Sequence, residues 1–71
     1  MAFIKNYVKK LREEKGLTQE QLAKKVHVSR QTINAIETGR YKPSIILALK
    51  MANIFELPME QIFILEPSDW E

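Results

Sequence analysis

Apolar residues recur along this chain at the spacing of helices that each bury one side. The strongest pattern covers residues 18–37, as two short segments separated by a break at residues 27–28. Within each segment the apolar residues return after three or four positions, which predicts two short amphipathic helices. Their inward positions are Leu22, Ala23, Val26, Ile33 and Ile36.

Both segments begin with residues that cap helices. Thr18 precedes the first segment and Gln21 follows three positions later, which predicts a capping box. Ser29 precedes the second segment and predicts its N-cap. With the apolar side of this second helix turned inward, its outward positions are Arg30, Gln31, Thr32 and Asn34.

The break between the two helices has the order apolar, X, apolar, serine, with His27 at X. The chain must reverse here within three residues, and position X then needs a positive φ. Glycine is the expected residue at such a position, while histidine adopts the left-handed region at some cost in strain. The alternative roles for His27 are a pH sensor or a contact to a phosphate.

The rest of the pattern predicts a small helical bundle. Asn6 is expected to cap the first helix and Gly16 to end it, while Ser44 caps the fourth. Pro58 belongs in the first turn of a short fifth helix, where its missing N–H costs little. These three helices are expected over residues 7–15, 45–55 and 59–62.

The two ends of the chain are apolar and β-prone rather than helical. We predict that residues 2–4 and about 63–66 pair as short antiparallel strands beside the bundle. A bundle this small cannot bury all of these side chains, so some should be available to a second copy. The expected dimer interface is Phe3, Ile62, Ile64 and Leu65. Frayed termini are the alternative.

Length and composition exclude several classes of protein. Seventy-one residues allow one domain, residues 1–71, with one small core. The chain has no cysteine and one histidine, so no disulfide and no metal site of the usual ligands is expected. No apolar run is long enough to cross a bilayer and no signal peptide is evident, which predicts a soluble, cytoplasmic protein without a membrane partner.

The charge is distributed unevenly along the chain. Residues 1–55 carry all eleven Lys and Arg and four Glu, for a net charge of +7, while residues 56–71 carry five acidic side chains and no basic one, for −5. A basic body favours a polyanionic partner, and an acidic tail is expected to face away from it. The simpler alternative is that these charges only solvate a small surface.

A basic and an amide side chain at the start of an exposed helix are suited to reading base edges in the DNA major groove. Arg30 can bind guanine and Gln31 adenine, each through two hydrogen bonds. Thr32 and Asn34 are the further candidates for base contacts. Phosphate contacts are expected from Gln19, Ser29, Arg40, Tyr41 and Lys42, which lie at helix starts or in the loop after the reading helix.

The chain resembles the phage Cro/repressor-type helix-turn-helix family, also called the XRE family, of the compact stand-alone kind. The similarity extends from residues 11–19 through residues 37–44 to residues 58–63. It implies a mainly α fold, a five-helix repressor-like bundle, and a homodimer that binds double-stranded operator DNA and most often represses. It also implies that Arg12 pairs with Glu37. His27 departs from the family pattern, which has glycine at the turn.

Three other functions compete with that of a repressor. An antitoxin would use the same fold to neutralise a toxin and repress its own operon, and an adaptor would keep the fold without reading DNA. Catalysis is the weakest alternative, because Glu13 and Glu14 are adjacent and diverge on a helix, and no nucleophile–base set is present. No cofactor and no small-molecule ligand are expected. The role of Trp70, at a dimer seam or free, stays open.

Overall fold

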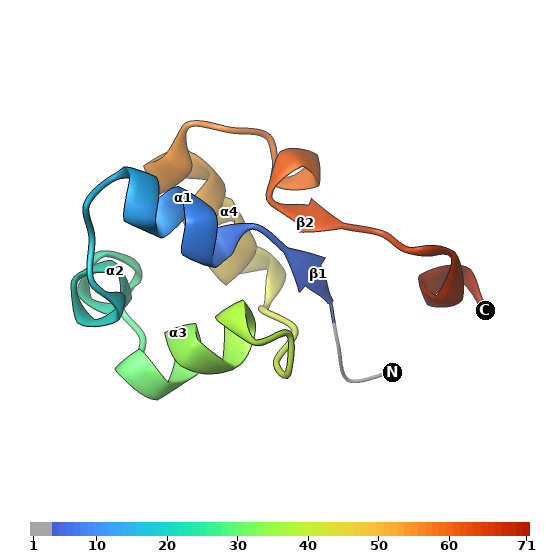
Figure 1. Ribbon diagram of the computed structural model, residues 1–71, viewed down its shortest axis with the longest axis horizontal. Coiled ribbons are helices and arrows are strands. Elements are labelled where there is room, and N and C mark those ends of the chain that lie inside the picture. Colours follow the sequence, from blue (N-terminus) through green and yellow to red (C-terminus); the bar gives the residue numbers. More distant parts are fainter. Residues whose placement is uncertain (1–3) are drawn as a thin grey trace.

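The computed structural model describes residues 4–71, which form a bundle of α-helices with two short strands at one side (Figure 1). Helices α2 and α3 are joined by a tight corner, and α1 and α4 pack over them. In chain order the elements are β1 (Lys5–Asn6), α1 (Val8–Glu14), α2 (Gln19–Val26), α3 (Arg30–Glu37), α4 (Ile45–Phe55), the 3-10 helix η1 (Met59–Gln61), β2 (Phe63–Ile64) and the 3-10 helix η2 (Pro67–Trp70).

One hydrophobic core holds the four α-helices together. Every inward position expected in α2 and α3 is buried, and α1, α4 and the segment after η1 add the remaining core side chains. Burying each large aliphatic side chain contributes about 1.5–3 kcal/mol, which is the main stabilisation available to so small a chain. The fully enclosed side chains are Val8, Leu22, Val26, Ile33, Ile36, Met51 and Ile62.

The predicted starts of three helices are confirmed. The hydroxyl of Thr18 accepts the backbone N–H of Gln21 at 3.0 Å, and the Gln21 side chain accepts the N–H of Thr18 at 2.9 Å, which completes the capping box. Ser29 and Ser44 cap α3 and α4 in the same way, each accepting an N–H three residues later at 3.1 Å. These bonds satisfy amides that have no partner inside the helix.

Two helix predictions are corrected. The expected fifth helix is only the 3-10 turn η1, so four α-helices form rather than five. Three residues cannot close the hydrogen-bonded rings of an α-helix, and the next residue already leads into β2. The first helix has Tyr7 rather than Asn6 at its N-cap, although the Asn6 side-chain oxygen still accepts the N–H of Val8 at 3.1 Å.

The two strands form an antiparallel pair, as predicted, but at a shifted position. Lys5 pairs with Ile64 and Asn6 with Phe63. The N-terminal strand therefore follows residues 2–4 instead of comprising them; Ile4 lies before it, and Ala2 and Phe3 lie outside the described residues. The cause is the bond from the Tyr7 N–H to the Ile62 carbonyl at 2.9 Å, which fixes the register directly before α1.

Candidate nucleic-acid interface

The corner between α2 and α3 has the backbone that its sequence predicts. His27 adopts φ 62° and ψ 47°, the left-handed region, and ends α2. Its own N–H and that of Val28 both turn back to the carbonyl of Ala23, the latter at 3.0 Å. A side chain with a Cβ is strained at this angle, so the corner forms at some cost in stability.

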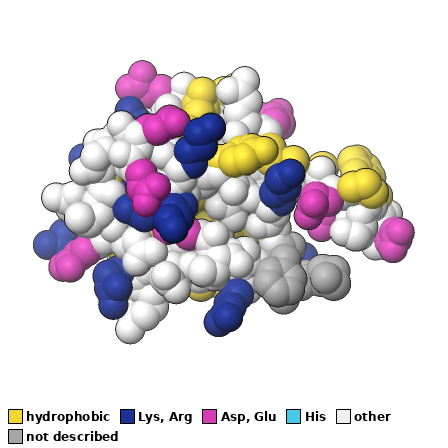
Figure 2. All heavy atoms as spheres, in the orientation of Figure 1, with side chains coloured by type: hydrophobic (Ala, Val, Ile, Leu, Met, Phe, Trp, Pro, Cys, Tyr) yellow, Lys and Arg dark blue, Asp and Glu magenta, His cyan; other side chains and the backbone are white. Residues whose placement is uncertain are grey.

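The outward side of α3 carries the residues predicted to contact bases. Arg30, Gln31 and Asn34 are exposed and Thr32 is half-buried, while Ile33 and Ile36 on the opposite side are fully buried. Helix α3 lies at the lower edge of the molecule in Figure 1, and Figure 2 shows Lys and Arg side chains standing out from that edge. The exposed side of this helix is therefore polar, with one basic side chain, Arg30, on its first turn.

The hydroxyls at the start of α3 are engaged with each other. The Ser29 oxygen accepts the N–H of Thr32 at 3.1 Å and lies 3.0 Å from the Thr32 hydroxyl oxygen. Each hydroxyl retains capacity for a further bond. Both side chains therefore shape the start of the helix whether or not they also contact DNA.

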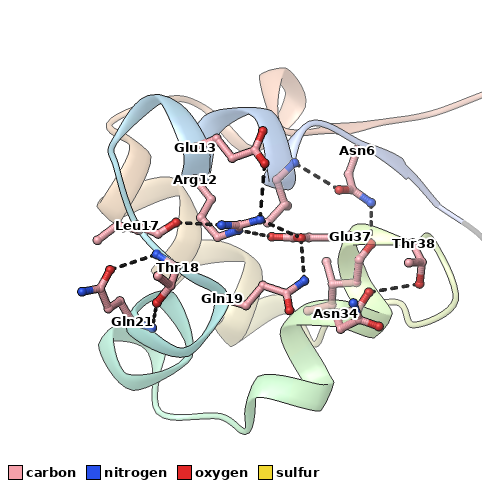
Figure 3. A network of polar contacts seen from close by, with 12 residues as sticks. Asn6, Arg12, Glu13, Leu17, Thr18, Gln19, Gln21, Asn34, Glu37 and Thr38 are labelled. Carbon is pink, nitrogen blue, oxygen red and sulfur yellow. Dashed lines mark hydrogen bonds and ion pairs between the residues drawn. The ribbon is translucent and has the colours of Figure 1, made fainter.

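A buried ion pair ties α1 to the end of α3 (Figure 3). The Arg12 Nε donates to Glu37 Oε2 at 2.6 Å and Nη2 donates to Oε1 at 3.3 Å. The two side chains are 10% and 3% exposed. Arg12 Nη1 also donates to the Leu17 carbonyl at 2.7 Å, so the guanidinium joins α1, the following loop and α3. The hydrogen bond to Glu37 raises the pKa of Arg12 above its ordinary value.

Gln19 is joined to this pair, a contact that the sequence pattern did not indicate. Its side-chain Nε2 donates to Glu37 Oε1 at 3.0 Å. The Glu37 carboxylate therefore accepts hydrogen bonds from α1, through Arg12, and from α2, through Gln19 (Figure 3). As the first residue of α2, Gln19 also has a backbone N–H without a partner inside its helix. The residue expected to meet a phosphate therefore also fixes α2 against α3.

Asn6 fastens the same C-terminal end of α3 to β1. Its Nδ2 donates to the Ile36 carbonyl at 2.8 Å and to the Ile4 carbonyl at 3.1 Å. The side chain thus bridges β1 and the last turn of α3, where backbone carbonyls lack helical partners. Sequence reasoning assigned Asn6 only to the start of α1, because its bond to Ile36 spans thirty residues.

The loop after α3 carries the second group of predicted phosphate contacts. Arg40, Tyr41 and Lys42 are all exposed. The loop leaves the helix through Gly39 at φ 80°, and the Arg40 N–H donates to the Ala35 carbonyl at 2.8 Å. These side chains follow α3 directly and are free to meet a polyanion on that flank.

The predicted dimer residues do not form one surface. Ile62 is fully buried in the core of the single chain, so its assignment to an interface is wrong. Ile64 is half-buried, Leu65 is 62% exposed and Phe3 lies outside the described residues. The larger exposed apolar surface is on α4, at Ile45, Ile46 and Leu49, with exposures of 69%, 65% and 54%.

A signal for this α4 surface exists in the sequence. Residues 45–49 are five consecutive apolar residues. One stripe facing a core accounts for three to four apolar positions in every two turns, so part of such a run must face outward. Only Leu47 and Ala48 of the five are buried.

The fold and the exposed α3 define a helix-turn-helix protein whose second helix is positioned for the major groove. Known proteins agree with this class. A helix-turn-helix family model matches residues 8–62, and the chain belongs to the Cro/repressor-type, or XRE, family of DNA-binding transcription regulators. This is a regulatory family rather than an enzyme family.

Similar proteins occur in archaea and bacteria. An uncharacterised HTH-type transcriptional regulator of Methanocaldococcus jannaschii, MJ0272, is 53% identical over 93% of this chain and its own full length. YgzD of Bacillus subtilis, described in the same words, is 51% identical over 89% of this chain and 96% of its own. The restriction-modification controller protein C.AhdI of Aeromonas hydrophila superposes with a TM-score of 0.69 at 30% identity, covering 76% of this chain and 82% of its own.

The helices are also short. No helix within residues 4–71 has the length and apolar character that a membrane span requires.

Proposed function

We propose that this chain is a repressor that binds a near-palindromic operator as a homodimer, with α3 of each copy in the major groove of one half-site. The observation that carries the proposal is the contrast between the two sides of α3. Its inner side is fixed by Ile33, Ile36 and the buried Glu37, while Arg30 and Gln31 stand exposed on its first turn. A reading helix needs this combination, because base edges are recognised only by side chains held in register.

Each predicted contact has a distinct role in this proposal. Arg30 and Gln31 read bases, and Thr32 and Asn34 add base or water-mediated contacts. The backbone N–H of Gln19 meets a phosphate on one flank of α3, where the N-terminus of α2 favours an anion. On the other flank Arg40, Tyr41 and Lys42 meet the backbone of the DNA, together with the Ser29 hydroxyl at the start of the helix. These contacts position the protein without selecting a sequence.

The experiment is in vitro selection of the full chain against random DNA duplexes. We expect an enriched motif of two inverted half-sites whose centres lie about 34 Å apart, one turn of the double helix. Binding to that motif should weaken steeply as the salt concentration rises. A selection that returns no enriched motif would overturn sequence-specific binding, and a single unpaired half-site would overturn the homodimer.

A further inference from the structure

A shallow hollow lies beside the outer surface of α4, between that helix and the end of α2. Ile46, Leu49 and Ile54 give it an apolar floor, and Lys25, His27 and Lys50 stand at its rim together with a single asparagine. No acidic side chain of the described residues lines it. Ile46 and Leu49 are 65% and 54% exposed, so apolar surface beside the two lysines is open to solvent in the single chain.

The segment after β2 projects from the body of the molecule. We call residues 66–71 the arm; it contains η2 and extends from the end opposite α2, with hydrophobic and acidic side chains on its surface (Figures 1 and 2). Trp70, the one tryptophan of the chain, is 77% exposed. The carboxylates of Glu66, Asp69 and Glu71 make no ion pair within residues 4–71. The carboxylates of Glu66 and Asp69 accept backbone N–H groups at the start of η2, but a large aromatic side chain and three negative charges stand without a countercharge among the described residues.

We propose that the hollow of one copy receives Trp70 from the arm of a second copy, with the acidic side chains of that arm facing Lys25 and Lys50. The proposal rests on the homodimer of the proposed function and names the surface that forms it. Tryptophan is among the residues that contribute most to interfaces when it fills an apolar depression. The charges select the hollow, because a basic rim around an apolar floor complements an acidic segment that carries one aromatic side chain.

A second apolar hollow, on the other side of α4, fits the arm less well. It is bordered by Ile45, Met59, Phe63 and Leu65, and its lining includes one basic residue, Lys42, and one acidic residue, Glu60. These two charges offset each other, so this hollow attracts an acidic segment less than one that is lined by two lysines and no acidic residue. The basic hollow is therefore the site that the arm selects.

The arm reaches a second copy more readily than its own hollow. Six residues extend about 20 Å at most, and the molecule is 35 Å long, with the arm and α2 at opposite ends (Figure 1). Exchange between two copies also satisfies twofold symmetry, since each copy gives one arm and receives one. The dimer then contains two identical contacts between an arm and a hollow, so a substitution in either surface weakens both contacts.

The experiment uses two charge-reversed full chains in the absence of DNA. In Lys50→Glu the rim loses its net positive charge, because Lys25 alone offsets the new carboxylate, and in Glu71→Lys the arm keeps a net charge of only −1 from its three charged side chains. Sedimentation equilibrium should show that each variant alone dimerises about tenfold more weakly than the wild type, or worse. An equimolar mixture should recover part of the lost dimerisation, because in the mixed dimer the unaltered arm of Lys50→Glu meets the unaltered basic rim of Glu71→Lys, which restores one wild-type contact. Lys9→Glu, an exposed charge reversal on α1, is the control and should dimerise normally.

Each outcome decides the question. Recovery in the mixture supports exchange between copies, whereas two weak variants without recovery indicate an arm that closes on its own chain and overturn the proposal. Unchanged dimerisation of Lys50→Glu also overturns it, while a dimeric wild type that selects inverted half-sites leaves the proposed function standing. A wild type that stays monomeric at every concentration contradicts the homodimer itself.

Tryptophan emission gives an independent readout in the wild-type chain. As the dimer dissociates on dilution, emission from Trp70 should shift to longer wavelength because the indole returns to water. Emission that is constant through the measured dissociation range would contradict the arm exchange, even if other surfaces hold the dimer together.

Discussion

Glu37 at the end of α3 accepts hydrogen bonds from Arg12 at 2.6 Å and from Gln19 at 3.0 Å, so one buried carboxylate connects three of the four α-helices. The pair with Arg12 is the central relationship of the fold. A carboxylate that is 3% exposed is costly to bury unless it is paired and hydrogen-bonded, and here both conditions are met. The orientation of α3 therefore depends on a buried pair, Arg12 and Glu37, and on the side chain of Gln19.

Replacing Glu37 with Gln should lower the free energy of unfolding by about 2–3 kcal/mol. The amide keeps the shape of the side chain but leaves the buried Arg12 with only the exposed carboxylate of Glu13, 3.9 Å away, as an opposite charge. Urea denaturation measures the change. Glu20→Gln is the matched control, since Glu20 is 68% exposed and lies 4.0 Å from Lys24, a surface pair worth at most about 1 kcal/mol. Equal effects of the two substitutions would contradict a structural role for the buried pair.

The contribution of Arg12 to the free energy of unfolding should not change with pH around neutrality. Its hydrogen bond to Glu37 raises the pKa of Arg12, and a raised pKa gives stability that is fully present below the unfolded-state value and lost only when the pH rises through the folded-state value. The ordinary pKa of an arginine side chain is already far above neutral, so the folded-state and unfolded-state values both lie outside the neutral range. The difference in unfolding free energy between wild type and Glu37→Gln should thus be the same at pH 7 and pH 9. A difference that shrinks at pH 9 would contradict this assignment.

His27→Gly should stabilise the protein by about 0.5–1 kcal/mol, because glycine adopts φ 62° without the strain of a Cβ. Thermal unfolding measures the gain. Glu56→Gly is the matched variant, since Glu56 ends α4 with φ 57° and lies away from α3. Both should unfold at a higher temperature and select the same operator as the wild type. A loss of stability in His27→Gly alone would indicate that the imidazole makes a contact that outweighs the strain.

Arg30→Ala and Arg40→Ala should weaken DNA binding in different ways. Loss of Arg30 should relax the preference at one base pair, by about 1–3 kcal/mol of discrimination. Loss of Arg40 should weaken binding to all sequences alike and reduce the slope of log affinity against log salt by about one. Titrations of the selected operator and a scrambled duplex at several salt concentrations separate the two. The assignment fails if Arg40→Ala changes the preferred base or if Arg30→Ala leaves every preference intact.

Asn6→Asp should lower the free energy of unfolding by about 2 kcal/mol. Aspartate keeps the acceptor for the Val8 N–H but loses the two donors, to Ile36 and Ile4. Amide hydrogen exchange should become faster in β1 and in the last turn of α3. Gln61→Glu, an exposed amide-to-acid change on η1, is the control and should change stability by less than about 0.5 kcal/mol. Equal losses in both variants would remove the structural role given to Asn6.

Local sequence patterns are enough to predict the features that depend on bonds within one turn of the chain. The caps at Thr18, Ser29 and Ser44 join groups three residues apart, and the left-handed backbone at His27 follows from the corner that its neighbours require. Helical periodicity also identified the buried sides of α2 and α3. These features are readable because all of their atoms lie close together along the chain.

Tertiary structure alone decided the relationships between distant residues. The bond from Gln19 to Glu37 spans eighteen residues and that from Asn6 to Ile36 spans thirty, and neither follows from a local pattern. The sequence does not indicate which of the apolar residues near the C-terminus are buried. It predicts Ile62 at an interface, although the core of the single chain encloses this side chain. Each of these side chains could form the same kind of hydrogen bond or apolar contact with several residues of the chain. Only the packing of the helices against one another selects the partner.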